Sequence, residues 1–165
     1  AIHLIDESLK LSPNRQQFYF VAAEAYLNLG KPEQAVAALR QAYDLDRAYP
    51  EALANLVIVL ILSERDTDAE ALLQEFYGTT TPSDERFAEA YGQRGELDKA
   101  ILIWEAVVRR APHSSTGHAN LGVAYARVGR ADDAIRELER SVEIDPNFRS
   151  RVDQIIQQIR NGQLK

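Results

Sequence analysis

Small and large apolar side chains recur along this chain in an order that is typical of paired amphipathic helices. An alanine returns every 34 residues, apart from one spacing of 31, at Ala1, Ala35, Ala69, Ala100 and Ala134. Four residues after each alanine stands a larger apolar residue: Ile5, Leu39, Leu73, Trp104 and Leu138. Nine residues before each of the last four alanines stand Tyr26, Leu60, Tyr91 and Tyr125. A spacing of four is about one helical turn, so the pattern predicts a series of helix pairs.

The pattern also predicts the positions of the helices. The first helices of the pairs are expected at 16–29, 50–63, 82–93 and 115–128. The second helices are expected at 1–11, 33–45, 67–77, 97–110 and 131–144. A final helix at 149–161 carries Val152, Ile155, Ile156 and Ile159 on one face. This amphipathic helix is expected to cap the series, with its polar face toward water.

Turn and cap residues mark several helix ends. Gly30, Gly95 and Gly129 suit the left-handed residue that ends a first helix. The segment 67–70, Thr-Asp-Ala-Glu, matches a capping box, and Thr81-Pro82 matches a cap followed by the first helical position. The spacing of 31 is located between Tyr77 and Asp84, so the preceding helix is expected to end early, at Gly78. A weak joint near residue 80 and an independently folding 82–165 are predicted.

The repeated unit resembles the tetratricopeptide repeat, a helix–turn–helix of 34 residues. The fourth copy carries the family's pattern most completely, at Leu121, Gly122, Tyr125, Gly129, Ala134, Leu138 and Pro146. The second copy departs most from it, at Val57, Leu60, Glu64 and Phe76. The resemblance implies an all-α fold, an α-solenoid of antiparallel helix pairs. The expected organisation is a single domain, 1–165, with a leading helix at 1–14, repeats at 16–49, 50–80, 81–114 and 115–148, and a capping helix at 149–161.

Residues 56–62 are seven consecutive apolar residues, and they raise the question of what the second face of their helix contacts. Leu53, Leu56, Val57 and Leu60 follow the core spacing, which leaves the other face for the concave groove that the resemblance implies. The predicted groove residues are Gln17, Phe20, Val21, Glu24, Leu27, Asn28, Ala54, Asn55, Ile58, Ile61, Leu62, Arg86, Glu89, Asn120, Val123 and Arg127. The groove changes from apolar to polar along its length. Its apolar part is either covered by an apolar or amphipathic partner segment or shielded by its own neighbours.

Charge and composition narrow the class of protein. The net charge of −6 argues against a general nucleic-acid binder, which needs an excess of Lys and Arg. Residues 1–80 carry 6 basic and 12 acidic side chains, whereas 81–165 carry 13 of each. The apolar run is too short to span a bilayer, so no membrane insertion by this segment is expected, and a cytoplasmic location is favoured. The chain has no Met, and we expect it to be a piece of a longer protein.

Candidate chemistry is sparse, and the segment is predicted not to be an enzyme. His113 and His118 lack an acidic or cysteine partner at ligand spacing, so no metal is expected. Asp66, Asp68 and Glu70 imitate the start of a calcium loop without its glycine or closing Glu. Trp104 stands at the aromatic core position of its helix. No phosphate loop or nucleophile elbow is present, and no cofactor is expected.

Two functions follow from these patterns. The resemblance implies a non-catalytic scaffold that binds a protein or peptide in its groove. The alternative is a docking or regulatory C-terminal tail of a larger membrane enzyme, because 12–20 and 75–108 are loosely similar to the repeat tails of O-antigen ligases and polymerases. Apolar residues at the N-terminal end, Ile2, Ile5 and Leu9, further predict self-association as a possible homodimer through that end.

Overall fold

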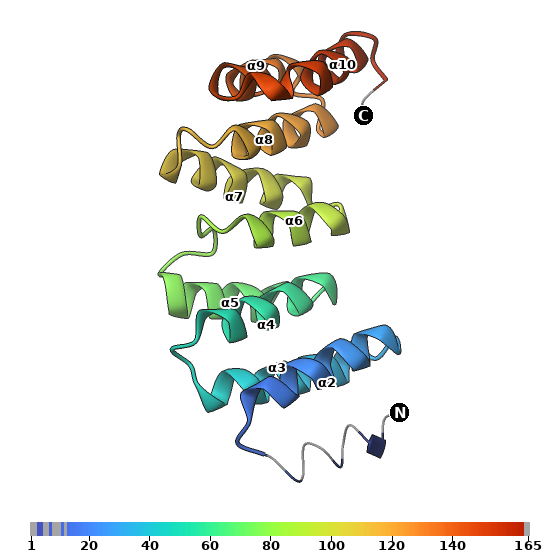
Figure 1. Cartoon of the computed structure of the whole chain (residues 1–165), viewed down its shortest axis with the longest axis vertical. Helices are drawn as coiled ribbons and strands as arrows, with labels where there is room; N and C mark the ends of the chain where they lie inside the picture. Colours follow the sequence, from blue (N-terminus) through green and yellow to red (C-terminus); the bar gives the residue numbers. More distant parts are fainter. Residues whose placement is uncertain (1–2, 5–6, 8–10, 12, 164–165) are drawn as a thin grey trace. The chain divides into compact units, whose positions relative to one another are not determined.

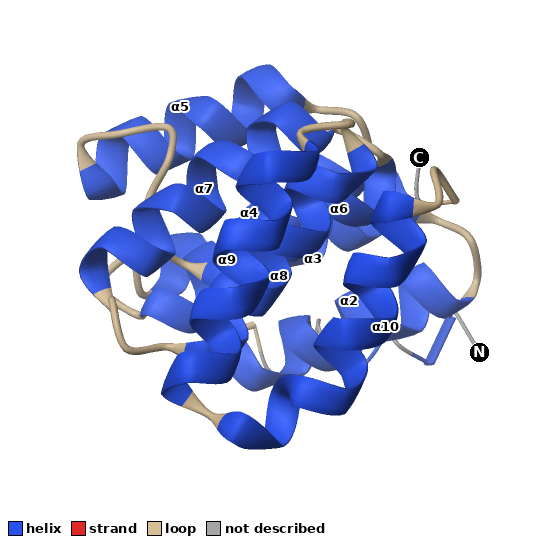
Figure 2. Ribbon diagram, turned by 90° about the horizontal axis from the view of Figure 1, so that it is seen from above, coloured by secondary structure: helices blue, strands red, loops and turns tan. Residues whose placement is uncertain are grey.

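The computed structural model describes residues 3–4, 7, 11 and 13–163, and the described regular elements are all helical (Figures 1 and 2). The chain divides into two compact units, unit 1 at Ala1–Gly78 and unit 2 at Thr79–Lys165. Their boundary lies in the segment where the repeat spacing shortens. Within the described ranges no helix has both the length and the apolar character needed to cross a bilayer.

Unit 1 contains α2 (Gln16–Asn28), α3 (Pro32–Leu45), α4 (Pro50–Leu62) and α5 (Asp66–Tyr77). Each helix packs against the next one along the chain, and Figure 1 shows the order. Proline at the first position of α3 and α4 helps each to begin, because its φ is already helical and its missing N–H would be unbonded there. The core positions predicted for α4 are confirmed: Leu53, Leu56, Val57 and Leu60 are fully buried.

Unit 2 contains α6 (Glu85–Arg94), α7 (Leu97–Arg110), α8 (Ser115–Arg127), α9 (Ala131–Ile144), the short 3-10 helix η1 (Pro146–Phe148) and α10 (Arg149–Arg160). The predicted capping role of the last helix is confirmed, because Val152 and Ile156 of α10 pack on Leu138 and Val142 of α9. The helix α8 lies close to α9 at Gly122, where an added Cβ would meet Leu138 Cγ at 2.7 Å. Only glycine permits this approach without a shift of the neighbouring helix.

Three predictions about helix starts need correction or fall outside the description. The third first-helix begins at Glu85 and not at 82, because Asp84 is its cap: the Asp84 carboxylate accepts from the Arg86 N–H at 3.1 Å. The capping box at 67–70 does not form either. The N-cap of α5 is Arg65, without a side-chain cap, and its guanidinium donates to Asp68. Most of the leading helix at 1–11, including Ile2, Ile5 and Leu9, lies outside the described residues, so the homodimer stays a prediction.

The turns from first to second helix share one hydrogen-bond pattern. In each, the residue that follows the turn's left-handed residue donates its N–H to the carbonyl oxygen five residues back: Lys31 to Tyr26, Arg65 to Leu60, Glu96 to Tyr91 and Arg130 to Tyr125, all at 2.9 Å. The residue before each donor is left-handed, at Gly30, Glu64, Gly95 and Gly129. This is the Schellman arrangement, which favours glycine. The predicted glycine ends are confirmed, and Gly78 likewise ends α5 in the left-handed region.

Glu64 is the exception, since it adopts φ +60° with a side chain. A left-handed conformation costs an L residue about 1–2 kcal/mol that glycine does not incur. Replacing Glu64 by Gly is therefore expected to raise the free energy of unfolding by about 1 kcal/mol, as measured by urea denaturation followed by circular dichroism.

The reverse substitution is the matched control. Gly129 has φ +80° in the equivalent turn of unit 2, so Gly129→Glu should lower the free energy of unfolding by about 1 kcal/mol. An unchanged or lowered stability of Glu64→Gly would show that the left-handed glutamate is not strained.

Candidate binding clefts

The unit 1 cleft opens between α2 and α4, with α3 beneath, and has a volume of about 460 Å³. Its lining is Gln17, Phe20, Val21, Ala23, Glu24 and Leu27 from α2, Leu39 from α3, and Asn55, Ile58 and Val59 from α4. Ala23 and Leu39 are buried at the floor, whereas Val21 is 58% and Leu27 43% exposed. Neighbouring side chains therefore cover the apolar residues at the floor of the cleft, whereas those at its rim stay exposed to water.

The polar residues of this cleft have no hydrogen-bond or ion-pair partner in the part of the chain that the structure describes. Within the described residues, the side chains of Gln17, Glu24 and Asn55 make no hydrogen bond or ion pair. Phe20 packs its ring near Tyr49, with ring centroids 6.3 Å apart. The cleft thus combines an apolar interior with two amides and one carboxylate whose hydrogen-bonding capacity is not used within the described chain.

Seven of the predicted groove residues line the unit 1 cleft: Gln17, Phe20, Val21, Glu24, Leu27, Asn55 and Ile58. Asn28 and Leu62 are exposed but do not line it. Ala54 and Ile61 require correction, since both are fully buried and belong to the core. The helix α4 is apolar nearly all round, and such a helix buries side chains on more than one side.

The unit 2 cleft has a volume of about 340 Å³ and a different lining. Its residues are Ala88, Glu89, Gly92 and Gln93 from α6, Leu97, Ala100 and Trp104 from α7, and Asn120, Val123, Ala124 and Arg127 from α8. Four of them, Glu89, Asn120, Val123 and Arg127, were predicted groove residues. The core role predicted for Trp104 is confirmed, because it is only 5% exposed and forms part of the floor.

Arg86, also predicted for the groove, instead pairs with Asp84 at the start of α6. Its guanidinium donates to both carboxylate oxygens of Asp84, from Nε at 3.0 Å and from Nη2 at 2.7 Å. This fork-to-carboxylate pairing secures the start of α6, so Arg86 does not line the cleft. The sequence offered one signal for it, an Asp two residues before an Arg at a helix start.

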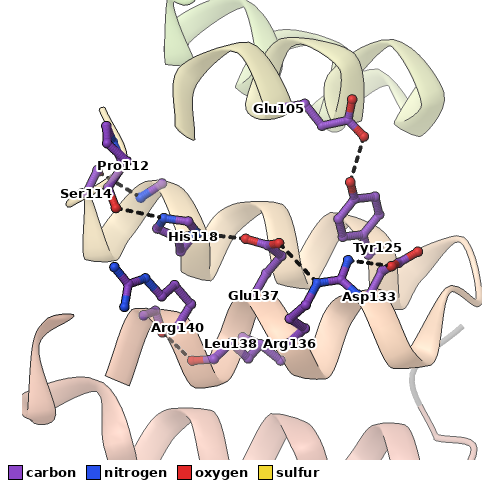
Figure 3. Close-up of polar contacts among 12 residues, drawn as sticks. Glu105, Pro112, Ser114, His118, Tyr125, Asp133, Arg136, Glu137, Leu138 and Arg140 are labelled. Atoms are coloured by element: carbon purple, nitrogen blue, oxygen red, sulfur yellow. Dashed lines mark hydrogen bonds and ion pairs between the residues drawn. The ribbon is translucent and has the colours of Figure 1, made fainter. Parts of the chain in front are cut away.

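Polar contacts join α8 to its neighbours α7 and α9 (Figure 3). The Tyr125 hydroxyl donates to Glu105 Oε1 of α7 at 2.6 Å. His118 Nδ1 lies 2.7 Å from Glu137 Oε2 of α9, and its Nε2 lies 3.2 Å from the Pro112 carbonyl oxygen. Both ring nitrogens of His118 therefore have structural partners. In the described part of the chain, no cluster of three potential metal ligands occurs.

The family assignment rests on comparison with known sequences. The family model described as tetratricopeptide repeat matches residues 1–50 and 86–147, and a second model of the same description matches 29–76. The chain belongs to the tetratricopeptide repeat family. Proteins of this family typically act in protein–protein interaction.

Individual tetratricopeptide relatives are distant and longer. The heat shock protein sti1 homolog of Schizosaccharomyces pombe is 24% identical over 153 residues, which cover 90% of this chain and 25% of that protein. The repeat-containing protein YpiA of Bacillus subtilis is 22% identical over 189 residues, which cover 91% of this chain and 44% of that protein. The chain thus spans between a quarter and a half of these relatives. They lend no support to the weaker resemblance to O-antigen ligase tails.

Solved structures confirm the all-α tetratricopeptide fold. A crystal structure of MamA has a TM-score of 0.62 and 24% identity, covering 88% of this chain and 87% of that one. YrrB, described as a tetratricopeptide protein with an unusual peptide-binding site, has a TM-score of 0.54 and 22% identity, covering 88% and 76%. At these identities the likeness shows the fold alone.

The contact of Tyr125 with Glu105 generates a prediction about pH. Burial first, and then the hydrogen bond to Glu105, raises the pKa of Tyr125 from 10.0 to about 12. A raised folded-state pKa gives stability that is fully present below the unfolded pKa, near 10, and is lost as the pH rises through the folded value. The free energy of unfolding should fall by about 2 kcal/mol between these two pH values.

Urea denaturation on either side of this interval measures the effect. Tyr125→Phe has no hydroxyl to titrate and should lose less stability across the interval, whereas Tyr49→Phe, at a 40% exposed tyrosine, should behave like the unsubstituted protein. Equal losses for Tyr125→Phe and the unsubstituted protein would contradict the role assigned to this hydroxyl.

Proposed function

We propose that this protein is a non-catalytic interaction module that binds an amphipathic, basic segment of a partner protein in the unit 1 cleft. The observation that carries the proposal is the pairing of exposed apolar residues, Val21 and Leu27, with a cleft whose polar rim includes Glu24. The family's usual role in protein–protein interaction supports it.

The apolar lining supplies the driving force. Covering a Val, Leu or Ile side chain that is otherwise in water contributes roughly 1.5–3 kcal/mol when its burial is complete. Val21 and Leu27 are about half exposed, so a partner gains part of that range at each. An amphipathic helix laid into such a cleft would cover both residues with one apolar stripe.

The polar residues supply orientation. Gln17 and Asn55 each carry an amide that both donates and accepts hydrogen bonds, and neither side chain has a partner within the described chain. Buried polar groups need partners, so a segment that covers these amides must offer them hydrogen bonds. This requirement favours a partner with polar groups beside its apolar stripe.

The net negative charge of unit 1 favours a positively charged partner segment. Unit 1 carries 6 basic and 12 acidic side chains, a formal charge of −6, whereas unit 2 carries 13 of each. An acidic surface accelerates the approach of a cationic segment and repels an anionic one. Lys or Arg flanking the apolar stripe would meet Glu24 at the cleft itself.

Selection from a library of random peptides, about sixteen residues long, tests the proposal on the full chain. Selected peptides should combine apolar residues at helical spacing with Lys or Arg, and Val21→Glu should weaken their binding at least tenfold in fluorescence polarisation. The reason is that a carboxylate at the apolar rim loses its hydration when the peptide covers it.

The matched control is Leu102→Glu, which makes the same kind of change at a 51% exposed apolar residue of α7 that lines neither cleft. This variant should bind the selected peptides with unchanged affinity, and both variants should keep the circular dichroism of the unsubstituted chain. A folded Val21→Glu variant that binds these peptides normally would overturn the assignment of the unit 1 cleft.

A further inference from the structure

The unit 2 cleft contains a helical glycine where the other repeats have a side chain. Gly92 stands eight residues before the repeat alanine Ala100, and the equivalent residues of the other copies are Leu27, Ile61 and Ala126. Leu27 lines the unit 1 cleft, and Ile61 is fully buried. The third copy therefore has a gap at a position that other copies fill.

Neither packing nor backbone conformation requires glycine at this position. Gly92 lies inside α6, and its φ is not among the positive values that favour glycine. Apart from its two chain neighbours and the backbone of its own helix, a Cβ added there would meet no atom of the described chain within 4 Å. Gly122 is the contrasting case, since its Cβ would meet Leu138 Cγ at 2.7 Å. Glycine inside a helix is unfavourable relative to alanine, so Gly92 lowers helix stability without a compensating contact within the described chain.

The walls around this gap bear both signs of charge. Glu89 and Gln93 stand on α6, and Asn120 and Arg127 stand on α8. None of these four side chains makes a hydrogen bond or ion pair within the described ranges. Beneath them lie apolar groups, with Leu97 and Val123 half-buried and Trp104 almost covered. The gap thus has an apolar base and an open polar rim.

We infer that the unit 2 cleft is a second peptide site, in which Gly92 leaves room for one apolar side chain of a partner segment that also carries an acidic residue. The partner's apolar side chain enters the gap over Gly92 and contacts Leu97 and Val123. Its carboxylate pairs with Arg127, and the amides of Asn120 and Gln93 bond its polar groups. The inference rests on the proposed function and extends it, because the basic partner of the unit 1 cleft and the acid-bearing partner of the unit 2 cleft differ in charge.

The test uses peptides selected on the full chain and measures how strongly each peptide binds to two variants. Gly92→Leu fills the gap with the side chain that the first copy carries, and it should weaken binding of peptides containing Asp or Glu at least tenfold. Arg127→Glu should do the same through charge repulsion. Val21→Glu should leave these acidic peptides unaffected. Ala71→Leu, at an exposed residue of α5 outside both clefts, is the matched control and should change neither peptide class.

A milder variant separates a binding role from a structural one. Gly92→Ala should raise the Tm by a few degrees through helix propensity, and it should nevertheless weaken the acidic peptides several-fold. A lowered Tm would mean that the fold needs this glycine, and it would overturn the inference. Normal binding of all peptides by Gly92→Leu and Gly92→Ala would also overturn it.

The selection distinguishes this failure from failure of the proposed function. If only basic, Val21-sensitive peptides emerge, the second site is refuted and the unit 1 cleft stands. If only acidic, Gly92-sensitive peptides emerge, the second site stands and the unit 1 assignment is refuted.

Discussion

Close approach of helices at small residues is the constraint on which the rest of this structure depends. The repeat alanines are at most 1% exposed: Ala35, Ala69, Ala100 and Ala134. A larger side chain one turn later fills the space beside each alanine, as Leu73 and Leu138 do at zero exposure. Because protein interiors are packed about as densely as organic crystals, this alternation of small and large residues determines how far apart neighbouring helices lie. The clefts exist because the helices that carry them are held at that separation.

Local strain and local openness occur where the repeats depart from their common pattern. The second copy keeps its turn although Glu64 takes the left-handed conformation that glycine adopts elsewhere. The third copy keeps its helix although no contact in the described chain requires glycine at Gly92. In the first case the fold overrides a residue's preference, and in the second it tolerates a loss of helix stability. Departures of this kind are where function is to be sought, since the remaining positions are explained by packing.

The two units differ in electrostatics more than in architecture. Unit 1 holds the whole net charge of −6, and the side chain of Glu24 stands without an ion pair among its described neighbours. Unit 2 is neutral overall, and several of its described acidic and basic side chains are bonded to each other, as Arg130, Arg136 and Asp133 are. Paired charges of this kind lower the pKa of the Asp133 carboxyl and leave little field at a distance. Long-range steering of a partner is therefore a property of unit 1.

Periodicity in the sequence determined the helix pairs, most of their ends and the core, because these depend on residues one to four turns apart and the same solution recurs in each copy. Three of the four first-helix turns were readable from Gly30, Gly95 and Gly129 for the same reason, whereas the turn at Glu64 carries no such signal. Only the tertiary structure decided which groove positions reach water. Ala54 and Ile61 follow the groove register and yet are fully buried, Arg86 is held by Asp84, and Gly92 exposes a gap. Exposure depends on side chains contributed by neighbouring helices and loops, and no pattern within one helix contains that information.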